Sequence, residues 1–295
     1  MRIKTYVLAA AAMTMLAVSC DRNGELMETE LYHRADSTAF AFMTMDAELP
    51  SGSGKVASEV RSGLSEVIDR VLGYVTSYED ERFFPPFDGD ADDTGALLDY
   101  YRDGAFGVIA RKAQEDADER ATYIIEDSDL TDEQKEQILA DFPRWEYDFS
   151  LKKIDDNERY VVFQSMDYIY MGGAHGGITG EGCLTFSKKD GSRVADFVDA
   201  SRADELQPLM IAGMLRYYSE NGYDTTWDEL KESLFIEDGF IPLPSWPLYP
   251  SDEGLNFVYH QYEIASYAEG MPSFTVPYAD IEPFLTPAAR ELLGL

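Results

Sequence analysis

Strict alternation of large apolar and polar residues between positions 145 and 152 constrains the fold of this chain most. The apolar members of this segment are Trp145, Tyr147, Phe149 and Leu151. Successive side chains of a β-strand point to opposite faces, so this spacing predicts a strand with one buried face. Apolar runs bounded by turn residues predict further strands over 38–49, 160–171, 180–187, 192–197, 255–264 and 273–276. Asp190-Gly191, between two of them, is typical of a tight hairpin turn.

Helical spacing of apolar residues alternates with the predicted strands. Apolar residues recur every three or four positions over 56–71, 97–109 and 206–217, which predicts three amphipathic helices. Thr131 and Gln134 have the spacing of a capping box, so a short helix is expected to begin there. Hydrophobic residues make up 45% of the chain, which is enough for a packed core. Together these patterns predict an α+β fold, with an antiparallel sheet and helices packed on one face.

The first twenty residues indicate where the protein is delivered. A short basic segment precedes an apolar stretch over 6–18, which is shorter than the roughly 20 residues needed to cross a bilayer. This arrangement predicts a signal peptide over 1–19 that is removed. Leu16-Ala-Val-Ser-Cys20 resembles a bacterial lipobox, so Cys20 is the expected site of lipid attachment. The expected location is the cell envelope, with the protein lipid-anchored to a membrane on its periplasmic or surface-exposed side.

The rest of the chain is predicted to fall into three parts. Residues 20–37 are polar and are expected to form a tether. Residues 38–144 are expected to form a helical N-terminal half, and 145–295 a sheet-rich C-terminal domain. Cys20 and Cys183 are the two cysteines, so a lipid on Cys20 leaves no disulfide to stabilise the fold. Cys183 is expected to be a small buried apolar residue.

Acidic residues dominate the charge of the chain. Asp and Glu number 56 against 24 Lys and Arg, a formal net charge of -32. Such a chain gains nothing from releasing counterions at phosphates, which excludes nucleic acid as a partner. The same charge opposes docking of the protein surface on anionic lipids, so the lipid anchor is the one membrane contact expected. Basic partners, in contrast, would be attracted.

Two blocks rich in glycine and tyrosine identify a family. The first is Tyr168-Ile-Tyr-Met-Gly-Gly-Ala-His175, and the second is Phe257-Val-Tyr-His-Gln-Tyr-Glu-Ile-Ala-Ser-Tyr-Ala-Glu-Gly270. In this order they resemble the RsiV-like envelope domain family of unknown function, with Ser266 where that family usually has proline. The family includes the extracellular domain of the lysozyme-sensing anti-sigma factor RsiV and the accessory domain of some peptidoglycan deacetylases.

The resemblance implies a non-catalytic binding module whose ligand is a basic, lysozyme-like muramidase or the cell-wall glycan, peptidoglycan. Glycines at the end of a strand predict a bulge or a close backbone approach. Tyrosine is enriched in the residues that dominate protein interfaces, so the tyrosines of both blocks can form a contact surface. The expected ligand-binding residues are Gly172, Gly173, His175, Tyr168, Tyr170 and Tyr267. No catalytic residue and no cofactor is predicted.

An alternative function is an uncharacterised envelope hydrolase in which His175 acts with an acidic partner such as Asp167. His33, His175 and His260 are too far apart in sequence to show a metal-ligand spacing, so no metal site is predicted from them. The acidic segment Asp88–Asp99 shares part of the spacing of a calcium loop. Asp93 stands where such a loop needs glycine, which favours a solvated loop and leaves calcium binding as an open alternative.

Overall fold

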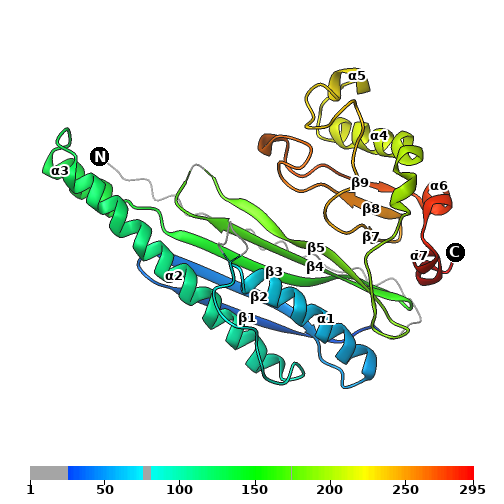
Figure 1. Ribbon diagram of the computed structural model, residues 1–295, viewed down its shortest axis with the longest axis horizontal. Coiled ribbons are helices and arrows are strands. Elements are labelled where there is room, and N and C mark those ends of the chain that lie inside the picture. The colour runs from blue at the N-terminus through cyan, green and yellow to red at the C-terminus, as the bar shows by residue number, and fades with distance from the viewer. Residues whose placement is uncertain (1–25, 76–80, 174) are drawn as a thin grey trace, which may run out of the picture.

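The computed structural model describes residues 26–75, 81–173 and 175–295, so the predicted signal peptide and Cys20 lie outside the described residues. A six-stranded sheet with the order β1-β2-β3-β4-β5-β6 runs through the centre of the molecule (Figure 1). Its strands are β1 (Thr29–Ser37), β2 (Ala41–Pro50), β3 (Trp145–Asp156), β4 (Tyr160–Tyr170), β5 (Gly177–Ser187) and β6 (Arg193–Val194).

All neighbouring strands of this sheet are antiparallel except β2 and β3. These two run parallel, with Ala41 opposite Trp145. Parallel strands need a long crossover connection. Here the crossover contains three helices, α1 (Lys55–Leu72), α2 (Thr94–Glu126) and α3 (Asp132–Ala140). The predicted α+β class is confirmed, and the sheet is mostly rather than wholly antiparallel.

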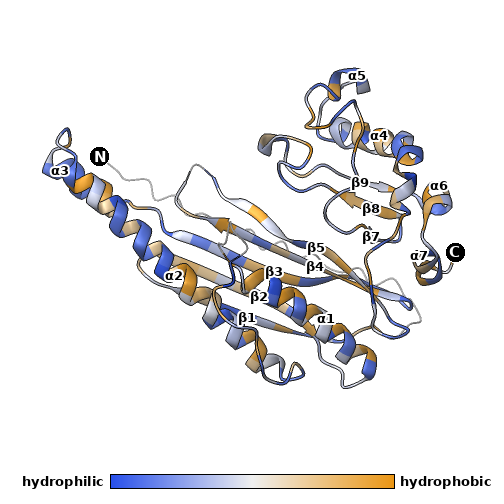
Figure 2. Cartoon of the chain, viewed as in Figure 1, coloured by the Kyte–Doolittle hydropathy of each residue, from blue (hydrophilic) through white to orange (hydrophobic). Residues whose placement is uncertain are grey.

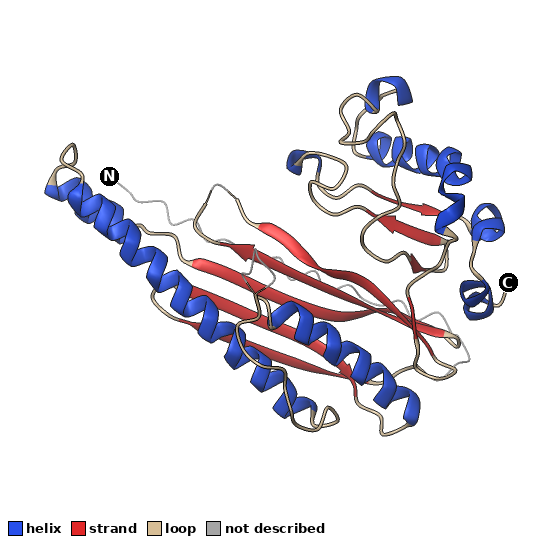
Figure 3. Cartoon of the chain, in the orientation of Figure 1, coloured by secondary structure: helices blue, strands red, loops and turns tan. Residues whose placement is uncertain are grey.

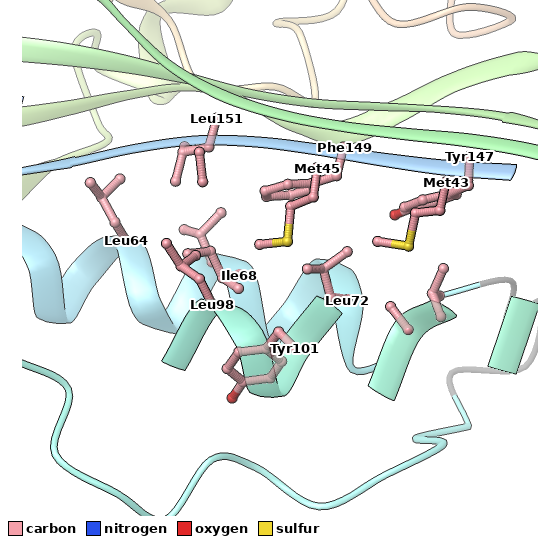
Figure 4. Packing of buried hydrophobic residues seen from close by; sticks show 14 of the residues in the cluster. Met43, Met45, Leu64, Ile68, Leu72, Leu98, Tyr101, Tyr147, Phe149 and Leu151 are labelled. Atoms are coloured by element: carbon pink, nitrogen blue, oxygen red, sulfur yellow. The ribbon is translucent and has the colours of Figure 1, made fainter. Parts of the chain in front are cut away.

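Helices α1 and α2 cover one face of the large sheet (Figures 1 and 3). The alternating apolar residues of β3 are buried, as their spacing predicts, and their polar neighbours are partly or fully exposed. Figure 4 shows Met43 and Met45 of β2 lying opposite Ile68 and Leu72 of α1, all of them buried. Apolar side chains that exclude water in this way make the layer between sheet and helices the first hydrophobic core.

Residues 197–295, which we call the C-terminal unit, pack on the opposite face of the sheet at β4 and β5 (Figure 1). Its main elements are α4 (Ala203–Glu220), which packs on β9 (Ser273–Val276), and a small antiparallel sheet of β7 (Tyr249–Pro250), β8 (Leu255–Val258) and β9. Shorter elements are η1 (Ala200–Arg202), α5 (Trp227–Leu230), η2 (Tyr267–Glu269), α6 (Tyr278–Ile281), η3 (Glu282–Phe284) and α7 (Pro287–Leu293). This unit contains most of a second hydrophobic core.

Strand β4 joins the two cores. Val161 and Phe163 point into the first core, whereas Tyr160 and Val162 point into the second. A strand buried on both faces reads as a continuous apolar run rather than an alternation, which explains the sequence Tyr160-Val-Val-Phe163. The two halves of the chain are therefore packed through shared strands and not through a linker.

Several elements differ from the sequence-based prediction. β1 occupies part of the segment expected to be a tether, and β2 brings residues from before position 144 into the same sheet as β3. Helix α2 extends to Glu126, although Ala117 is its last buried residue, and its end near α3 is largely hydrophilic (Figure 2). β8 ends at Val258, so His260 lies in a loop and not in a strand.

The capping box predicted at the start of α3 is present. The Thr131 side chain accepts from the Gln134 backbone N–H at 3.3 Å, and the Gln134 side chain accepts from the Thr131 backbone N–H at 2.9 Å. No helix among residues 26–75, 81–173 and 175–295 is both long and apolar enough to cross a membrane.

Candidate functional site

Two segments that are far apart in the sequence meet at one end of the large sheet. One is the connection between β4 and β5, and the other is the loop over 259–270 that follows β8 (Figure 1). Aromatic side chains from both segments gather there, and we call these four residues the aromatic cluster: Tyr168, His175, Tyr262 and Tyr267. The two blocks noted in the sequence thus form one surface.

His175 is held between the two segments. Its ring stacks on Tyr267, with 4.1 Å between ring centroids and 25° between ring planes. Its Nδ1 lies 2.8 Å from the carbonyl oxygen of Gly176, which can only accept, so Nδ1 is the donor. Nε2 lies 3.5 Å from the Tyr262 hydroxyl and is free to accept from it. The imidazole is therefore oriented by both segments, although the residue is exposed to solvent.

Glycines allow the β4–β5 connection to adopt this shape. Gly172 has a φ of +75°, a conformation that residues with a Cβ rarely adopt. Gly176 has an ordinary φ, but a Cβ there would lie 2.3 Å from the ring of Tyr168. Gly173 has neither constraint, since no atom lies within 4 Å of its Cβ position. Of the expected Gly172-Gly173 pair, only Gly172 needs to be glycine, because of its backbone conformation. The close approach is at Gly176 instead.

Tyr267 is presented by a short turn that Ser266 begins. The Glu269 carboxylate accepts from the Ser266 backbone N–H at 3.0 Å and from its hydroxyl at 3.2 Å. The carbonyl oxygen of Glu269 accepts from the Tyr217 hydroxyl at 2.9 Å, which ties the turn to α4. Serine at this position thus forms a side-chain hydrogen bond that the proline of related sequences could not form.

Tyr262 is 55% exposed, so its ring is available to a partner. Its φ of +65° is left-handed, which costs an L-residue roughly 1–2 kcal/mol. The loop is held around it, because the Glu263 carboxylate accepts from the backbone N–H of His260 at 2.7 Å and of Ser245 at 2.6 Å. Strain of this kind collects at binding and catalytic sites.

The loop is also fastened to the start of β5. His260 Nε2 lies 2.6 Å from the carbonyl oxygen of Ile178, and the Gln261 side chain accepts from the Ile178 backbone N–H at 2.9 Å. His260 is thus a structural residue. Burial raises the pKa of Tyr168, with the Glu146 carboxylate adding to the shift, so this phenol stays protonated at neutral pH.

The remaining sequence-predicted residues have different surroundings. Tyr170 lies on the same face of β4 as Tyr168, and within the described part of the chain no ring contact joins it to the aromatic cluster. Tyr259 is fully buried and donates to the carbonyl oxygen of Pro242 at 2.8 Å, so it belongs to the core. Tyr262, a tyrosine of the second block, and Gly176, which directly follows the first block, are not among the six expected ligand-binding residues, and their position in or beside the blocks is the signal that could have found them.

The residues considered for catalysis or metal binding are not brought together. Asp167 accepts hydrogen bonds from Thr179 and Tyr147, whereas His175 contacts Gly176, Tyr262 and Tyr267. No group of three or more His, Cys, Asp or Glu side chains in the described ranges is placed to hold a metal ion. Burial raises the pKa of the Cys183 thiol to about 12, which makes it a poor nucleophile.

The acidic segment Asp88–Asp99 has structural roles for three of its carboxylates. Asp92 accepts from the buried guanidinium of Arg61 at 2.6 Å, and Asp93 caps α2 by accepting from the backbone N–H of Ala96 at 3.1 Å. Asp99 accepts from the Tyr32 hydroxyl at 2.7 Å. These carboxylates therefore point to different partners instead of to one centre.

Comparisons with known proteins place this fold. Residues 196–279 match the family described as "Protein of unknown function (DUF3298)". A crystal structure of a DUF3298 family member from Bacteroides fragilis is similar over 93% of this chain and 100% of its own, with a TM-score of 0.62 and 16% identity. One from Pseudomonas aeruginosa is similar over 89% and 96%, with a TM-score of 0.53 and 14% identity. The search of curated proteins returns no match. The matched residues include Tyr262 and Tyr267 and exclude the β4–β5 connection.

Proposed function

We propose that this chain, which carries a DUF3298 domain over residues 196–279, is a non-catalytic binding module of the cell envelope. The aromatic cluster is its contact surface, and the partner is a basic, lysozyme-like muramidase. The observation that carries the proposal is the stack of His175 on Tyr267, which joins two separate segments into one exposed aromatic surface.

The chemistry of the cluster supports binding rather than catalysis. Tyrosine side chains offer a large apolar face and a hydroxyl, and they lose little conformational freedom when they enter an interface. The cluster is already ordered by backbone contacts, which lowers the entropy cost of association. Among the described residues the contacts of His175 are Gly176, Tyr262 and Tyr267 and include no carboxylate, which favours binding over the alternative of a hydrolase.

The charge of the chain supports a basic protein over peptidoglycan. A net charge of -32 raises the encounter rate with a cationic partner and opposes an anionic polymer. The resemblance of the two sequence blocks to the RsiV-like family points to the same class of partner. Lipid attachment at Cys20 would hold the module in the cell envelope, where muramidases meet peptidoglycan.

Replacement of Tyr267 with alanine is expected to weaken binding of a hen-type lysozyme by at least about tenfold, because truncating an aromatic hot spot removes about 1.4 kcal/mol or more. Calorimetry at low salt and at half-molar salt measures this. Tyr123, which is 67% exposed on α2 and outside the aromatic cluster, is the matched control, and Tyr123→Ala should bind like the wild type. If the wild type gave binding heat at low salt only, the interaction would be charge attraction alone. Absence of binding heat at both salt concentrations would refute the muramidase proposal.

The lipid anchor is tested separately. Cys20→Ser should abolish incorporation of an alkynyl fatty acid and leave an uncleaved precursor, because acylation of the cysteine precedes lipoprotein cleavage. Cys183→Ser is the control. This buried thiol should not be labelled, so its replacement should leave fatty-acid incorporation and precursor cleavage unchanged. Equal labelling of Cys20→Ser and the wild type would contradict the anchor.

A further inference from the structure

His260 lies where the loop over 259–270 meets β5, and both of its ring nitrogens face carbonyl oxygens. Nε2 lies 2.6 Å from the carbonyl oxygen of Ile178, and Nδ1 lies 2.7 Å from that of Gln261. A carbonyl oxygen can only accept, so each nitrogen has to donate. A neutral imidazole has one N–H and satisfies one of these contacts, whereas an imidazolium has two and satisfies both. The surroundings of His260 therefore fit the protonated ring.

The other two histidines of the chain have different partners. Nδ1 of His175 also faces a carbonyl oxygen, that of Gly176, but its Nε2 faces the Tyr262 hydroxyl, which can donate. A neutral ring thus satisfies both contacts of His175. His33 contacts the carboxylate of Asp46 on the exposed strand β1. His260 is the one histidine that lies between two carbonyl oxygens.

Two carboxylates act on the ring of His260. Glu263, in the same loop, accepts from the His260 backbone N–H at 2.7 Å. Asp167 lies on β4, where burial raises its pKa and the charge of His260 is among the influences that lower it. The indole of Trp246 packs against the imidazole with 5.2 Å between ring centroids, and it does not titrate. Negative charge on two neighbouring elements favours a cation at this position.

Both contacts of the His260 ring hold the loop in place. Ile178 is bound through its two backbone groups, because its carbonyl oxygen accepts from His260 and its N–H donates to the Gln261 side chain at 2.9 Å. Without the Nε2 proton, the contact with β5 is lost. Without the Nδ1 proton, a lone pair faces the Gln261 carbonyl oxygen, whose peptide leads into the left-handed Tyr262. Either neutral tautomer therefore destabilises the loop that presents Tyr262 and Tyr267.

We propose that His260 is a pH-dependent latch for the aromatic cluster. Its ring carries a proton on both nitrogens while the loop is closed on β5, and loss of one of these protons opens the loop. The closed loop binds one proton more than the open loop, so closure is favoured at acidic pH and is lost as the pH rises through the titration of this ring. The latch acts on the surface on which the proposed function rests, but its tests need no partner. Failure of the latch would leave the muramidase proposal standing, and the reverse also holds.

The protonation of the ring is tested by NMR of the folded wild-type protein with isotope-labelled histidine. We expect His260 to show a proton on each ring nitrogen at every pH at which the Ile178 amide is protected from hydrogen exchange. Replacement of His260 identifies its signals. A His260 ring with a single proton in protein whose Ile178 amide is still protected would overturn the proposal.

The opening of the loop is tested by hydrogen exchange of the Ile178 amide, which is bound by Gln261 of the loop. Its protection, relative to the intrinsic exchange rate at each pH, should fall at least about tenfold from mildly acidic to mildly alkaline pH, because a hydrogen bond to a charged group is lost. The amides that pair β3 with β4 should keep their protection. Constant protection of Ile178 across this range would overturn the proposal.

His260→Phe removes both ring donors and keeps an aromatic side chain. Its Ile178 amide should be weakly protected at every pH. His33→Phe is the matched control, since it makes the same change on β1, and it should retain the pH dependence of the wild type. Wild-type protection and pH dependence in the His260→Phe protein would overturn the proposal. The two wild-type measurements decide it if this variant does not fold.

Discussion

Gly180→Ala is expected to lower the free energy of unfolding by about 2–4 kcal/mol, because it combines backbone strain with a direct clash. The φ of +112° at Gly180 lies in a region that is nearly closed to residues with a Cβ. An added Cβ would lie 2.7 Å from the carbonyl oxygen of Ser165 and 2.9 Å from Cα of Met166. Gly180 lies in a β-bulge, because Ser165 of β4 pairs with Gly182 but Asp167 pairs with Thr179, which leaves one extra residue in β5. Backbone atoms of the neighbouring strand cannot move aside as a side chain could, so this bulge must distort. Chemical denaturation followed by circular dichroism measures the change.

Gly177→Ala is the matched control. Gly177 begins the same strand, has no positive φ and has no atom within 4 Å of its Cβ position, so its replacement should change stability by less than about 0.5 kcal/mol. Distortion of the bulge should also displace the Thr179 hydroxyl from Asp167. Equal stability of the Gly180→Ala and Gly177→Ala proteins would show that the bulge is not fixed by Gly180.

Phe257→Ala is expected to cost about 3–5 kcal/mol, the range for deleting a buried aromatic side chain. Phe257 is fully buried in the second core and stacks on Phe274, with 5.1 Å between ring centroids and 12° between planes. Because β4 contributes side chains to both cores, we expect the loss to destabilise the whole chain and not the C-terminal unit alone. Hydrogen exchange in β2, whose buried apolar side chains belong to the first core, should accelerate by the same free energy.

Val258→Ala is the control for this variant. Val258 is the next residue of β8, is only partly buried and pairs with Ser273, so its truncation should cost about 1 kcal/mol or less. If Phe257→Ala left exchange in β2 unchanged while the C-terminal unit unfolded, the two cores would be independent folding units. The shared strand would then be a contact between domains and not a common framework.

Local patterns predicted much of the fold, and long-range pairing limited the rest. The alternation along β3 and the capping box of α3 arise within a few residues, and both are present. The parallel pairing of β2 and β3 depends on a crossover of about 90 residues, which no local pattern encodes. β1 is a largely exposed edge strand, so it has no apolar alternation to recognise. The charged end of α2 buries nothing beyond Ala117 and has no apolar stripe to read.

The candidate site was predictable in its segments but not in its geometry. The two blocks could be selected from their residues, yet their contact requires the C-terminal loop to return to the β4–β5 connection. The left-handed conformation of Tyr262 is imposed by that contact, because tyrosine has no preference for it. The sequence suggested Asp167 as an acidic partner of His175, but Asp167 is hydrogen-bonded to Thr179 and Tyr147 instead. Its contact with Thr179 depends on a β-bulge that the register between β4 and β5 defines, and register is a property of both strands.

The large sheet separates residues 27 and 293 from the aromatic cluster. The Met27 backbone N–H donates to Asp156 at 2.7 Å, and Arg159 donates to the carbonyl oxygen of Leu293, so these two residues lie beside the β3–β4 turn. The cluster lies beyond the other end of β4, whose 11 residues span about 36 Å at about 3.3 Å each. With an anchor at Cys20, the sheet would act as a rigid spacer. The aromatic cluster would then face away from the membrane, and a protein partner could bind it without contacting the lipid headgroups.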